Sequence, residues 1–253
     1  MLAAQRKELL LERLAREGRI VAKDFAAEVR TSEDSIRRDL RELAEAGLCQ
    51  RVYGGALPVS PAVADYSTRQ TVAVDSKTRV AATAAALIEP GMAVILDGGT
   101  TALAVARTLP STLNATVITH SPTIAAALGE HSSIDLFLIG GRIFKHSMVA
   151  SGAAAVEAAQ AITADIFLLG VTGVHHEAGL TTGDADEAAM KRALSRRSAE
   201  TYVLASSEKL GAASRYPVLP LAEITAVITD AKATDRAVGD LETAGVRILG
   251  ATT

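Results

Sequence analysis

This chain has few of the residues that define several classes of protein. Cys49 is the one cysteine among 253 residues, so no intrachain disulfide and no cysteine-based zinc site can form, and we expect Cys49 to be a small packing residue. Tryptophan is absent and aromatic residues make up 3% of the chain. This composition favours tightly packed helices and parallel strands over an aromatic binding platform.

Long hydrophobic runs and an excess of charge of either sign are also lacking. No apolar stretch approaches the ~18 residues of a membrane span, and the N-terminal residues do not follow the charged-then-apolar order of a signal peptide. We therefore expect a cytoplasmic protein with no membrane partner. The net charge is −3, and residues 1–57 hold 11 basic and 10 acidic side chains. Binding of nucleic acid would therefore depend on a local basic patch.

Three helical segments open the chain, at residues 5–17, 21–29 and 32–46, with Leu9, Leu10 and Leu14 facing inward from the first. The short links between them favour a compact helix-turn-helix. Residues 48–53 alternate as a strand does and run into Gly54-Gly55, which predicts a wing. We assign residues 1–57 to a winged helix-turn-helix DNA-binding domain of α+β class and residues 58–75, which show no strong periodicity, to a linker.

The third helical segment has the features of a DNA-recognition helix. Thr31 or Ser32 can cap its start, and Ile36, Leu40 and Leu43 form an inward stripe. Paired arginines on a helix are more often a solvated charged face, but the cap, the short turns and the wing favour contact with DNA. The residues that we expect to contact DNA, on this helix, the preceding one and the wing, are Lys23, Ser32, Asp34, Ser35, Arg37, Arg38, Arg41, Arg51 and Tyr53.

Residues 76–253 alternate helical segments with short apolar strands, which predicts an α/β domain with a mostly parallel sheet covered on both faces. The strands are expected at 93–96, 116–118, 134–139, 166–169, 202–205 and 226–229. Ligands of such sheets bind at the carboxyl ends of the strands. We expect the ligand to contact residues that follow the strands, together with two lysines later in the chain. These residues are Asp97, Gly98, Gly99, Thr100, Thr101, His120, Ser121, Gly140, Gly141, Arg142, Gly170, Thr172, Lys191 and Lys209.

These strand ends predict a pocket for a phosphorylated sugar or polyol, because glycine-rich loops before a helix expose backbone N–H groups to anions. A single Gly-Gly-Thr after a strand is usually only a tight turn, but here several such loops follow successive strands. His120 belongs to the expected pocket, whereas His146, His175 and His176 are expected at the surface. We expect no metal site and no cofactor, since no spacing of Asp, Glu or His supports one.

The segments Ser35-Ile36-Arg37-Arg38-Asp39-Leu40 and Arg51-Val52-Tyr53-Gly54-Gly55-Ala56 resemble those of the DeoR-type bacterial transcription regulators. Further matches are Leu96 to Thr101, Gly179-Leu180-Thr181-Thr182, Glu187 to Arg192 and Lys209-Leu210-Gly211, so the resemblance covers nearly the whole chain. It implies a winged helix that binds operator DNA and a sensor domain similar to ribose-5-phosphate isomerase that binds a phosphorylated sugar. It also adds Glu187 to the effector residues, and implies a repressor that forms homodimers or homotetramers.

The chain departs from the family pattern at three positions. Ser35 replaces the usual threonine, His120 stands where asparagine is common, and Ser206 stands where aspartate is common. A second hypothesis is a sugar-phosphate isomerase, which needs a carboxylate base. The acids of the isomerases are replaced here by Leu169 to Gly173, so Asp97, Asp186 and Glu187 remain as candidate bases. We expect a regulator of carbohydrate metabolism rather than an enzyme. A pure scaffold ranks last, because it would leave the loops and the arginine pair without a role.

Overall fold

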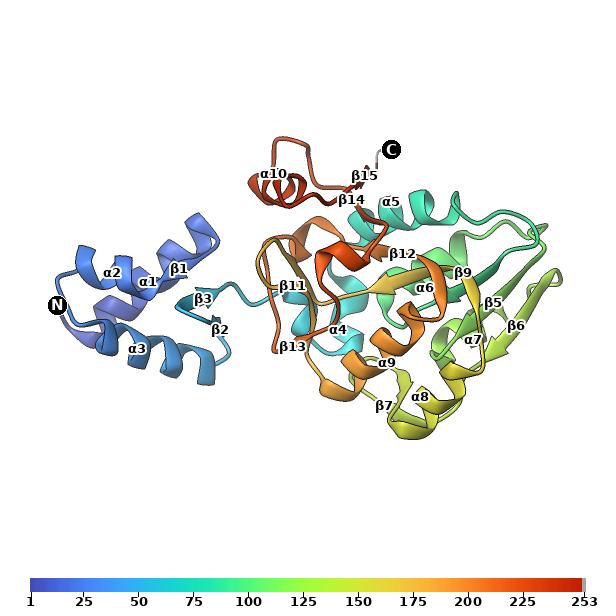
Figure 1. Ribbon diagram of the computed structural model, residues 1–253, viewed down its shortest axis with the longest axis horizontal. Helices are drawn as coiled ribbons and strands as arrows, with labels where there is room; N and C mark the ends of the chain where they lie inside the picture. The colour runs from blue at the N-terminus through green and yellow to red at the C-terminus, as the bar shows by residue number, and fades with distance from the viewer. Residues whose placement is uncertain (252–253) are drawn as a thin grey trace.

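The computed structural model describes residues 1–251, apart from the side chain of Pro61, and forms two lobes (Figure 1). The N-terminal lobe holds α1 (Ala3–Glu17), β1 (Ile20–Val21), α2 (Ala22–Glu28), α3 (Glu33–Glu45), β2 (Gln50–Val52) and β3 (Gly55–Leu57). Strands β2 and β3 pair antiparallel as the expected wing, and β1, which was not expected, pairs with β3. The predicted winged helix-turn-helix is confirmed.

One apolar cluster holds the N-terminal lobe together. Leu10, Phe25 and Ile36 bring α1, α2 and α3 into contact and are each at most 3% exposed. Leu9 was expected inward, but it is 41% exposed, because only Leu10 and Leu14, four residues apart, share the inner face. Cys49 is buried in this cluster, as expected of a packing residue.

The segment expected as a linker, residues 58–75, contains more structure than its sequence indicated. A single 3₁₀ turn, η1 (Pro61–Val63), is followed by α4 (Tyr66–Thr71), and α5 (Val74–Ala85) begins before the segment ends. A helix of six residues covers less than two turns, so it leaves no periodicity to detect. The domain boundaries at 57 and 76 stay a prediction.

A seven-stranded parallel sheet forms the centre of the described C-terminal lobe, in the order β15-β14-β12-β9-β4-β5-β6. These strands are β4 (Ala93–Leu96), β5 (Ala115–Thr119), β6 (Ile134–Leu138), β9 (Ala164–Gly170), β12 (Ser198–Leu204), β14 (Ala226–Thr229) and β15 (Ile248–Gly250). The chain order places β5 and β6 on one side of β4 and the later strands on the other. The topological switch point therefore lies between β4 and β9.

Helices cover both faces of the sheet, as predicted. Alternate side chains of each central strand enter opposite cores: Val94 and Leu96 face one and Ile95 faces the other. The first core contains residues of α5, α6 (Thr100–Thr108) and α7 (Pro122–Leu128). The second contains residues of α8 (Ala153–Gln160), α9 (Ala185–Ser195) and α10 (Arg236–Thr243). The α/β fold class is confirmed.

Two features of this lobe were not expected from the sequence. Strand β6, predicted to be buried, is an edge strand on which Phe137 is 49% exposed. Small antiparallel elements surround the carboxyl ends of the central strands: β7 (Arg142–Phe144) with β8 (Val149–Ser151), and β10 (Gly173–His175) with β11 (Gly179–Thr182) and β13 (Tyr216–Pro217). The turns η2 (Ser207–Lys209) and η3 (Leu221–Glu223) complete the lobe. Within residues 1–251, no helix is both long and apolar enough to cross a bilayer.

Candidate functional sites

The first candidate site is the exposed face of α3. Of the two expected caps, Ser32 is the one that forms: its Oγ accepts the backbone N–H of Ser35 at 3.2 Å. The Ser32 and Ser35 hydroxyls are 2.9 Å apart, so the serine at position 35 keeps a hydroxyl interaction at the start of the helix. Ile36, Leu40 and Leu43 are buried as predicted, which turns the opposite face of α3 to solvent.

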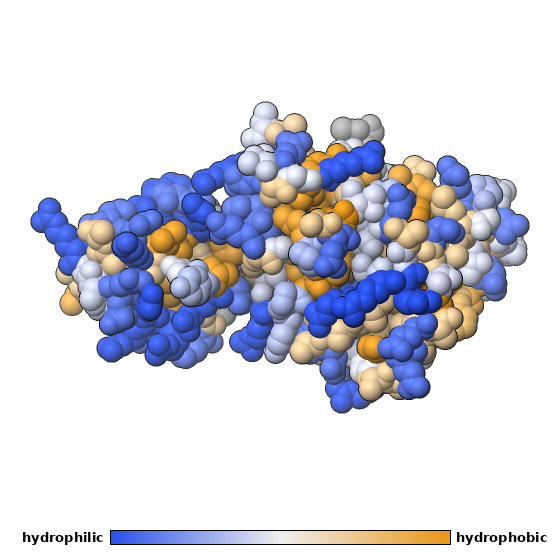
Figure 2. Space-filling view, viewed as in Figure 1, coloured by the Kyte–Doolittle hydropathy of each residue, from blue (hydrophilic) through white to orange (hydrophobic). Residues whose placement is uncertain are grey.

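The side chains predicted to contact DNA lie mostly on the surface of this lobe. Ser35 is half-buried, and the exposed members are Lys23, Ser32, Asp34, Arg37, Arg38, Arg41, Arg51 and Tyr53. The surface over α3 is largely hydrophilic (Figure 2). Arg37 donates to Glu33 one turn earlier at 2.6 Å, whereas Arg38 and Arg41 have no carboxylate within 4 Å among residues 1–251. Two arginines are therefore free to meet phosphates or bases.

The second candidate site is a cavity of about 240 Å³ at the carboxyl ends of β4, β9 and β12. It lies at the topological switch point, where open α/β sheets bind their ligands. Of the residues predicted for an effector site, those that line it are Gly98, Gly99, Thr100, Thr101, Gly170, Thr172, Glu187, Lys191 and Lys209.

The glycine loop after β4 forms one wall of this cavity. Gly99 has φ +105°, a conformation that favours glycine, and directly precedes α6. A Cβ on Gly98 would lie 1.9 Å from Val149 Cγ1, so only glycine fits between the loop and β8. No side chain caps α6 within the described structure. Its first backbone N–H groups are therefore available to an anion.

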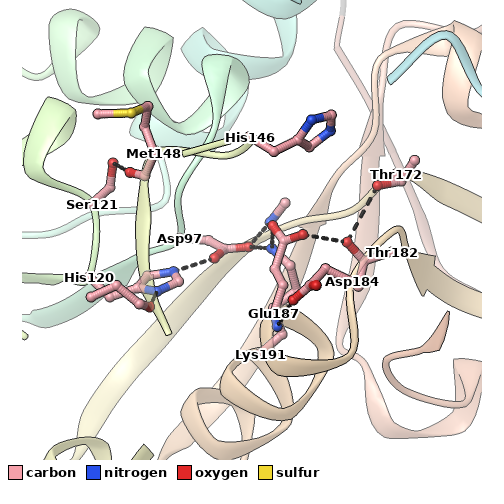
Figure 3. Close-up of polar contacts among 12 residues, drawn as sticks. Asp97, His120, Ser121, His146, Met148, Thr172, Thr182, Asp184, Glu187 and Lys191 are labelled. Carbon is pink, nitrogen blue, oxygen red and sulfur yellow. Dashed lines mark hydrogen bonds and ion pairs between the residues drawn. The ribbon is translucent and has the colours of Figure 1, made fainter. Parts of the chain in front are cut away.

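Beneath the cavity, Asp97 is the centre of a buried network (Figure 3). Its carboxylate accepts from Lys191 Nζ at 2.5 Å, from His120 Nε2 at 2.8 Å and from the Gly170 backbone N–H at 2.8 Å. The other ring nitrogen of His120 lies 2.9 Å from the Ala150 carbonyl oxygen. Both ring nitrogens therefore face oxygen atoms, and these two contacts fix the orientation of the buried ring.

This network differs from the sequence-based expectation. Asp97, His120 and Ser121 were predicted to contact the effector, but none of them lines the cavity and each is fully buried. Burial by itself would raise the pKa of Asp97, but the charge of Lys191 and the hydrogen bond from His120 outweigh it and hold that pKa at about 2. The three side chains therefore support the cavity from below instead of facing it.

Glu187 brings a carboxylate to the cavity itself. Its backbone N–H is accepted by Asp184 at the start of α9, at 2.9 Å, which fixes the first turn. Its Oε2 accepts from the Thr182 hydroxyl at 2.9 Å, and its Oε1 lies 3.4 Å from Lys191 Nζ (Figure 3). Lys191 is thus shared between two carboxylates. Asp186, another candidate base, is exposed and does not line the cavity.

Lys209 is a cation of a different kind. Its Nζ lies 3.4 Å from Thr101 Oγ1 and 3.3 Å from the Leu204 carbonyl oxygen, and no carboxylate lies within 4 Å of it in the described chain. Burial lowers its pKa to about 8. The charged side chains that line the cavity are Arg69, Lys77, Lys191, Lys209, Glu187 and Glu208, so cations outnumber carboxylates by four to two.

Gly140, Gly141 and Arg142 were also predicted for the effector site, and the structure places them elsewhere. All three are exposed and none lines the cavity. They follow the edge strand β6, which lies two strands away from β4 and therefore away from the switch point. The cavity lies instead at the ends of β4, β9 and β12, on the other side of β4 from β6.

The cavity also contains side chains that the sequence analysis missed. Five lining residues come from before the first strand of the sheet, namely Ala62, Val63, Arg69, Val72 and Lys77. The others are Phe144, His146, Ser147, Val171, Thr182, Gly183 and Glu208. The Gly179 to Thr182 match was the one sequence signal that pointed toward Thr182. His146 is exposed as expected, but at the edge of the cavity. The expectation for His175 was wrong, because it is 4% exposed.

His175, His176 and Glu177 bring one candidate metal-ligand atom each to within 4.8 Å of one another. His175 Nδ1 already accepts the backbone N–H groups of Glu177 and Ala178, at 3.1 and 3.3 Å. With Nδ1 accepting, the ring proton of neutral His175 lies on Nε2. A metal bound at Nε2 would displace this proton to Nδ1, where it would point at the two backbone N–H groups and break their hydrogen bonds. The local hydrogen bonds therefore disfavour a metal at this cluster.

Comparison with known proteins covers both lobes. Residues 6–62 match the model of the DeoR-like helix-turn-helix domain, and residues 72–231 match that of the DeoR C terminal sensor domain. The HTH-type transcriptional regulator GlpR of Haloferax volcanii is 32% identical, over 98% of each chain. The HTH-type transcriptional repressor GlcR of Bacillus subtilis is 32% identical, over 91% of this chain and 89% of its own.

Two further similarities are weaker. The glycerol-3-phosphate regulon repressor of Escherichia coli K12 is 28% identical, over 91% of this chain and 92% of its own. A solved ribose 5-phosphate isomerase from Methanocaldococcus jannaschii covers 54% of each chain, with 20% identity and a TM-score of 0.40. That structural likeness is too distant to inform either the fold or the chemistry.

Proposed function

This chain belongs to the DeoR family of transcriptional regulators, and on that premise we propose that it is a sequence-specific DNA-binding repressor of a carbohydrate operon. A phosphorylated sugar or polyol in the cavity of the C-terminal lobe controls its binding to DNA. DNA as its partner assigns it to the cytoplasm. In keeping with its family, it acts as a homodimer or homotetramer.

The observation that carries the effector assignment is the charge of the cavity. Lys209 has no carboxylate partner within the described residues and lies beside Thr101 in the first turn of α6. The uncapped N-terminus of that helix adds backbone N–H groups and the positive end of its dipole. A phosphoryl group fits this combination of fixed donors and uncompensated positive charge.

The rest of the cavity suits a small polyhydroxylated molecule. Glu187 presents a carboxylate that can accept hydrogen bonds from hydroxyl groups, and Glu208 has a buried Oε2 with no hydrogen-bond partner in the described chain. The volume of about 240 Å³ is below the usual range of drug-sized pockets, which begins at roughly 300 Å³. We therefore favour a compact sugar phosphate or polyol phosphate. A relative named for the glycerol-3-phosphate regulon agrees with this class.

Helix α3 supplies the side chains that contact DNA in this proposal. Arg38 and Arg41 are exposed and free of ion pairs within the described chain, and Arg37 is held by Glu33. Arg51 and Tyr53 lie exposed on the wing, where they can contact the flanking backbone. A bidentate arginine on guanine gives sequence discrimination, whereas contacts to phosphate give salt-dependent affinity.

An isomerase is the less favoured alternative. Asp97 is held ionised with a pKa of about 2 and is occupied by three donors, so it is a poor base. Glu187 is the one candidate base of the three that lines the cavity, and Lys191 and Thr182 already engage it. These contacts favour binding of a sugar phosphate over its turnover.

The test combines both sites. Purified protein is titrated with the DNA upstream of its own gene and of neighbouring genes, with and without a panel of sugar phosphates and polyol phosphates. We expect specific binding that one compound weakens at least tenfold. Turnover of a panel compound without binding to any of these DNA fragments would favour the isomerase instead.

A further inference from the structure

We propose that Arg69, carried by helix α4 in the segment that joins the two lobes, binds the anionic group of the effector and so ties the linker to occupancy of the cavity. This inference rests on the proposed function, because it needs an anionic effector. It adds a binding residue that lies outside the sheet and its loops. Helix α4 would then be the element whose position depends on whether the cavity is filled.

Helix α4 is fixed to the C-terminal lobe at both ends. Asp65 Oδ1 accepts the backbone N–H of Thr68 at 2.8 Å and caps its start. The Tyr66 hydroxyl donates to Thr123 Oγ1 at 3.2 Å. At the other end, Lys77 Nζ donates to the carbonyl oxygens of Arg69 and Val72. Lys77 thus uses its charge to hold the C-terminus of α4 and is less available to a ligand.

Arg69 reaches from α4 to the cavity that Lys209 also lines. Its Nη1 lies 3.8 Å from where a Cβ on Gly99 would be, which places the guanidinium beside the start of α6. Its Nη2 donates to the His146 carbonyl at 2.9 Å, and the group lies 5.8 Å from the centre of the Tyr66 ring. These contacts fix the plane of the guanidinium at the edge of the cavity.

One donor of this guanidinium is unused. Arg69 Nε is buried and has no hydrogen-bond partner in the described chain, and no carboxylate lies within 4 Å of the side chain. A buried N–H group without an acceptor costs free energy until one arrives. A planar fork of N–H donors matches the oxygens of a phosphoryl group better than a point charge does. Arg69 and the N-terminus of α6 would then hold the anion between them.

The position of α4 in the chain makes this contact relevant to regulation. The wing strand β3 ends at Leu57, and α4 begins at Tyr66. Between them, Val59 forms a bridge to Ala213, so the linker also touches the segment after Lys209. In Figure 1, α4 lies on the side of the C-terminal lobe that faces the N-terminal lobe. An anion that holds Arg69 would favour one position of α4, and a ligand shifts a conformational equilibrium only through such a difference.

The test measures binding by calorimetry with inorganic phosphate, glycerol 3-phosphate, a hexose 6-phosphate and the unphosphorylated hexose. We compare the wild type with Arg69→Met, Arg69→Lys and the matched control Arg107→Met, an exposed arginine in the last turn of α6. Arg69→Met should weaken the phosphorylated probes at least tenfold and leave any affinity for the hexose unchanged. Arg69→Lys should recover part of the loss, and Arg107→Met should match the wild type.

A second readout separates binding from a merely structural role. Hydrogen exchange of the amides in residues 66–71 should slow at least threefold when the tightest probe binds the wild type, and should not change in Arg69→Lys at equal occupancy. Wild-type affinity in Arg69→Met would overturn the role of Arg69 while leaving the proposed function intact. No binding of any phosphorylated probe to the wild type would overturn both. Should Arg69→Met not fold, Arg69→Lys decides: wild-type affinity together with wild-type slowing of exchange in that variant would overturn the role of Arg69.

Discussion

The exposed face of α3 and the cavity at the switch point both carry the charges of a recognition site, but they hold them in opposite ways. Arg38 and Arg41 are exposed and unpaired within the described chain, whereas Asp97 and Lys191 are 0% and 2% exposed and bound to each other. Water screens the first pair at little cost. The second pair is stable only because each charge has partners. Charged side chains are therefore free to meet a binding partner on α3, whereas beneath the cavity they hold the structure together.

The largest effect is expected beneath the cavity. Asp97→Asn removes the buried negative charge that accepts hydrogen bonds from Lys191 and His120, and removing one partner of a buried ion pair costs roughly 3–5 kcal/mol. Urea unfolding at pH 7 measures this loss. The control Asp34→Asn, on the exposed face of α3, should change stability by less than about 0.5 kcal/mol. Equal effects of the two variants would remove the contrast between the sites.

The same carboxylate gives a dependence on acid. The pKa of Asp97 is about 2 in the folded protein, below its ordinary 3.8. The unfolded chain therefore binds the proton more readily, and the stability that this carboxylate contributes is present above about pH 4 and is lost as the pH falls through about 2. In Asp97→Asn this part of the acid-induced loss should vanish.

The next largest effect concerns DNA. Arg38→Ala should weaken operator binding by about 1–3 kcal/mol if Arg38 reads a guanine, with loss of discrimination at that base pair. A contact to phosphate would instead reduce the salt slope by about one, uniformly across sequences. Gel shift or fluorescence anisotropy at several salt concentrations distinguishes the two, with Arg107→Ala as control. Unchanged affinity and unchanged salt slope would show that α3 is not the recognition helix.

A smaller effect follows from Lys209. Burial lowers its pKa to about 8, so the amine loses its positive charge as the pH rises above that value. The affinity for a phosphorylated effector should then fall about tenfold for each pH unit above 8. Calorimetry from pH 7.5 to 9.5 measures this slope, in a range where the phosphate stays a dianion. Lys209→Met should bind the phosphorylated effector weakly, and its affinity should not fall with pH in this range. If the affinity of this variant still fell with pH, the pH dependence would belong to another group.

The smallest effect is expected at the ion pair between Glu33 and Arg37. Glu33→Gln should change stability by no more than about 0.5 kcal/mol, as exposed pairs one turn apart do. It frees Arg37 and removes a negative charge from the surface of α3 that we propose contacts DNA. Operator affinity should therefore rise by less than about tenfold at low salt and converge on the wild type as salt increases. Glu157→Gln, on α8 in the other lobe, is the matched control and should leave both quantities unchanged.

The sequence was informative wherever a feature is local. The cap at Ser32, the buried stripe of Ile36, Leu40 and Leu43 and the wing all follow from residues a few positions apart, and the structure confirms them. The strand at 93–96 was predicted at its observed bounds because it is a continuous apolar run. The short helix α4 escaped prediction, since six residues give no full period.

The cavity was only partly predictable. The rule that ligands bind at strand ends correctly indicated Gly98 and Thr101, but it also selected Gly141 and Arg142, which follow an edge strand. His120 and Asp97 face each other instead of the cavity, a consequence of how β4 and β5 pair. Arg69 had no signal at all, because a helix 28 residues before Asp97 reaches the cavity only through tertiary packing.

The sequence by itself determined the winged helix, the parallel sheet and the glycine loop. These follow from local periodicity, turn chemistry and motif spacing, which act over a few residues. Tertiary structure alone decided which strand ends border the cavity, which charges are shared in pairs and which stay free. The physical reason is that the free energy of a buried charge depends on its neighbours in space, and α4, β9 and α9 bring those neighbours to the Gly98–Thr101 loop from distant parts of the chain.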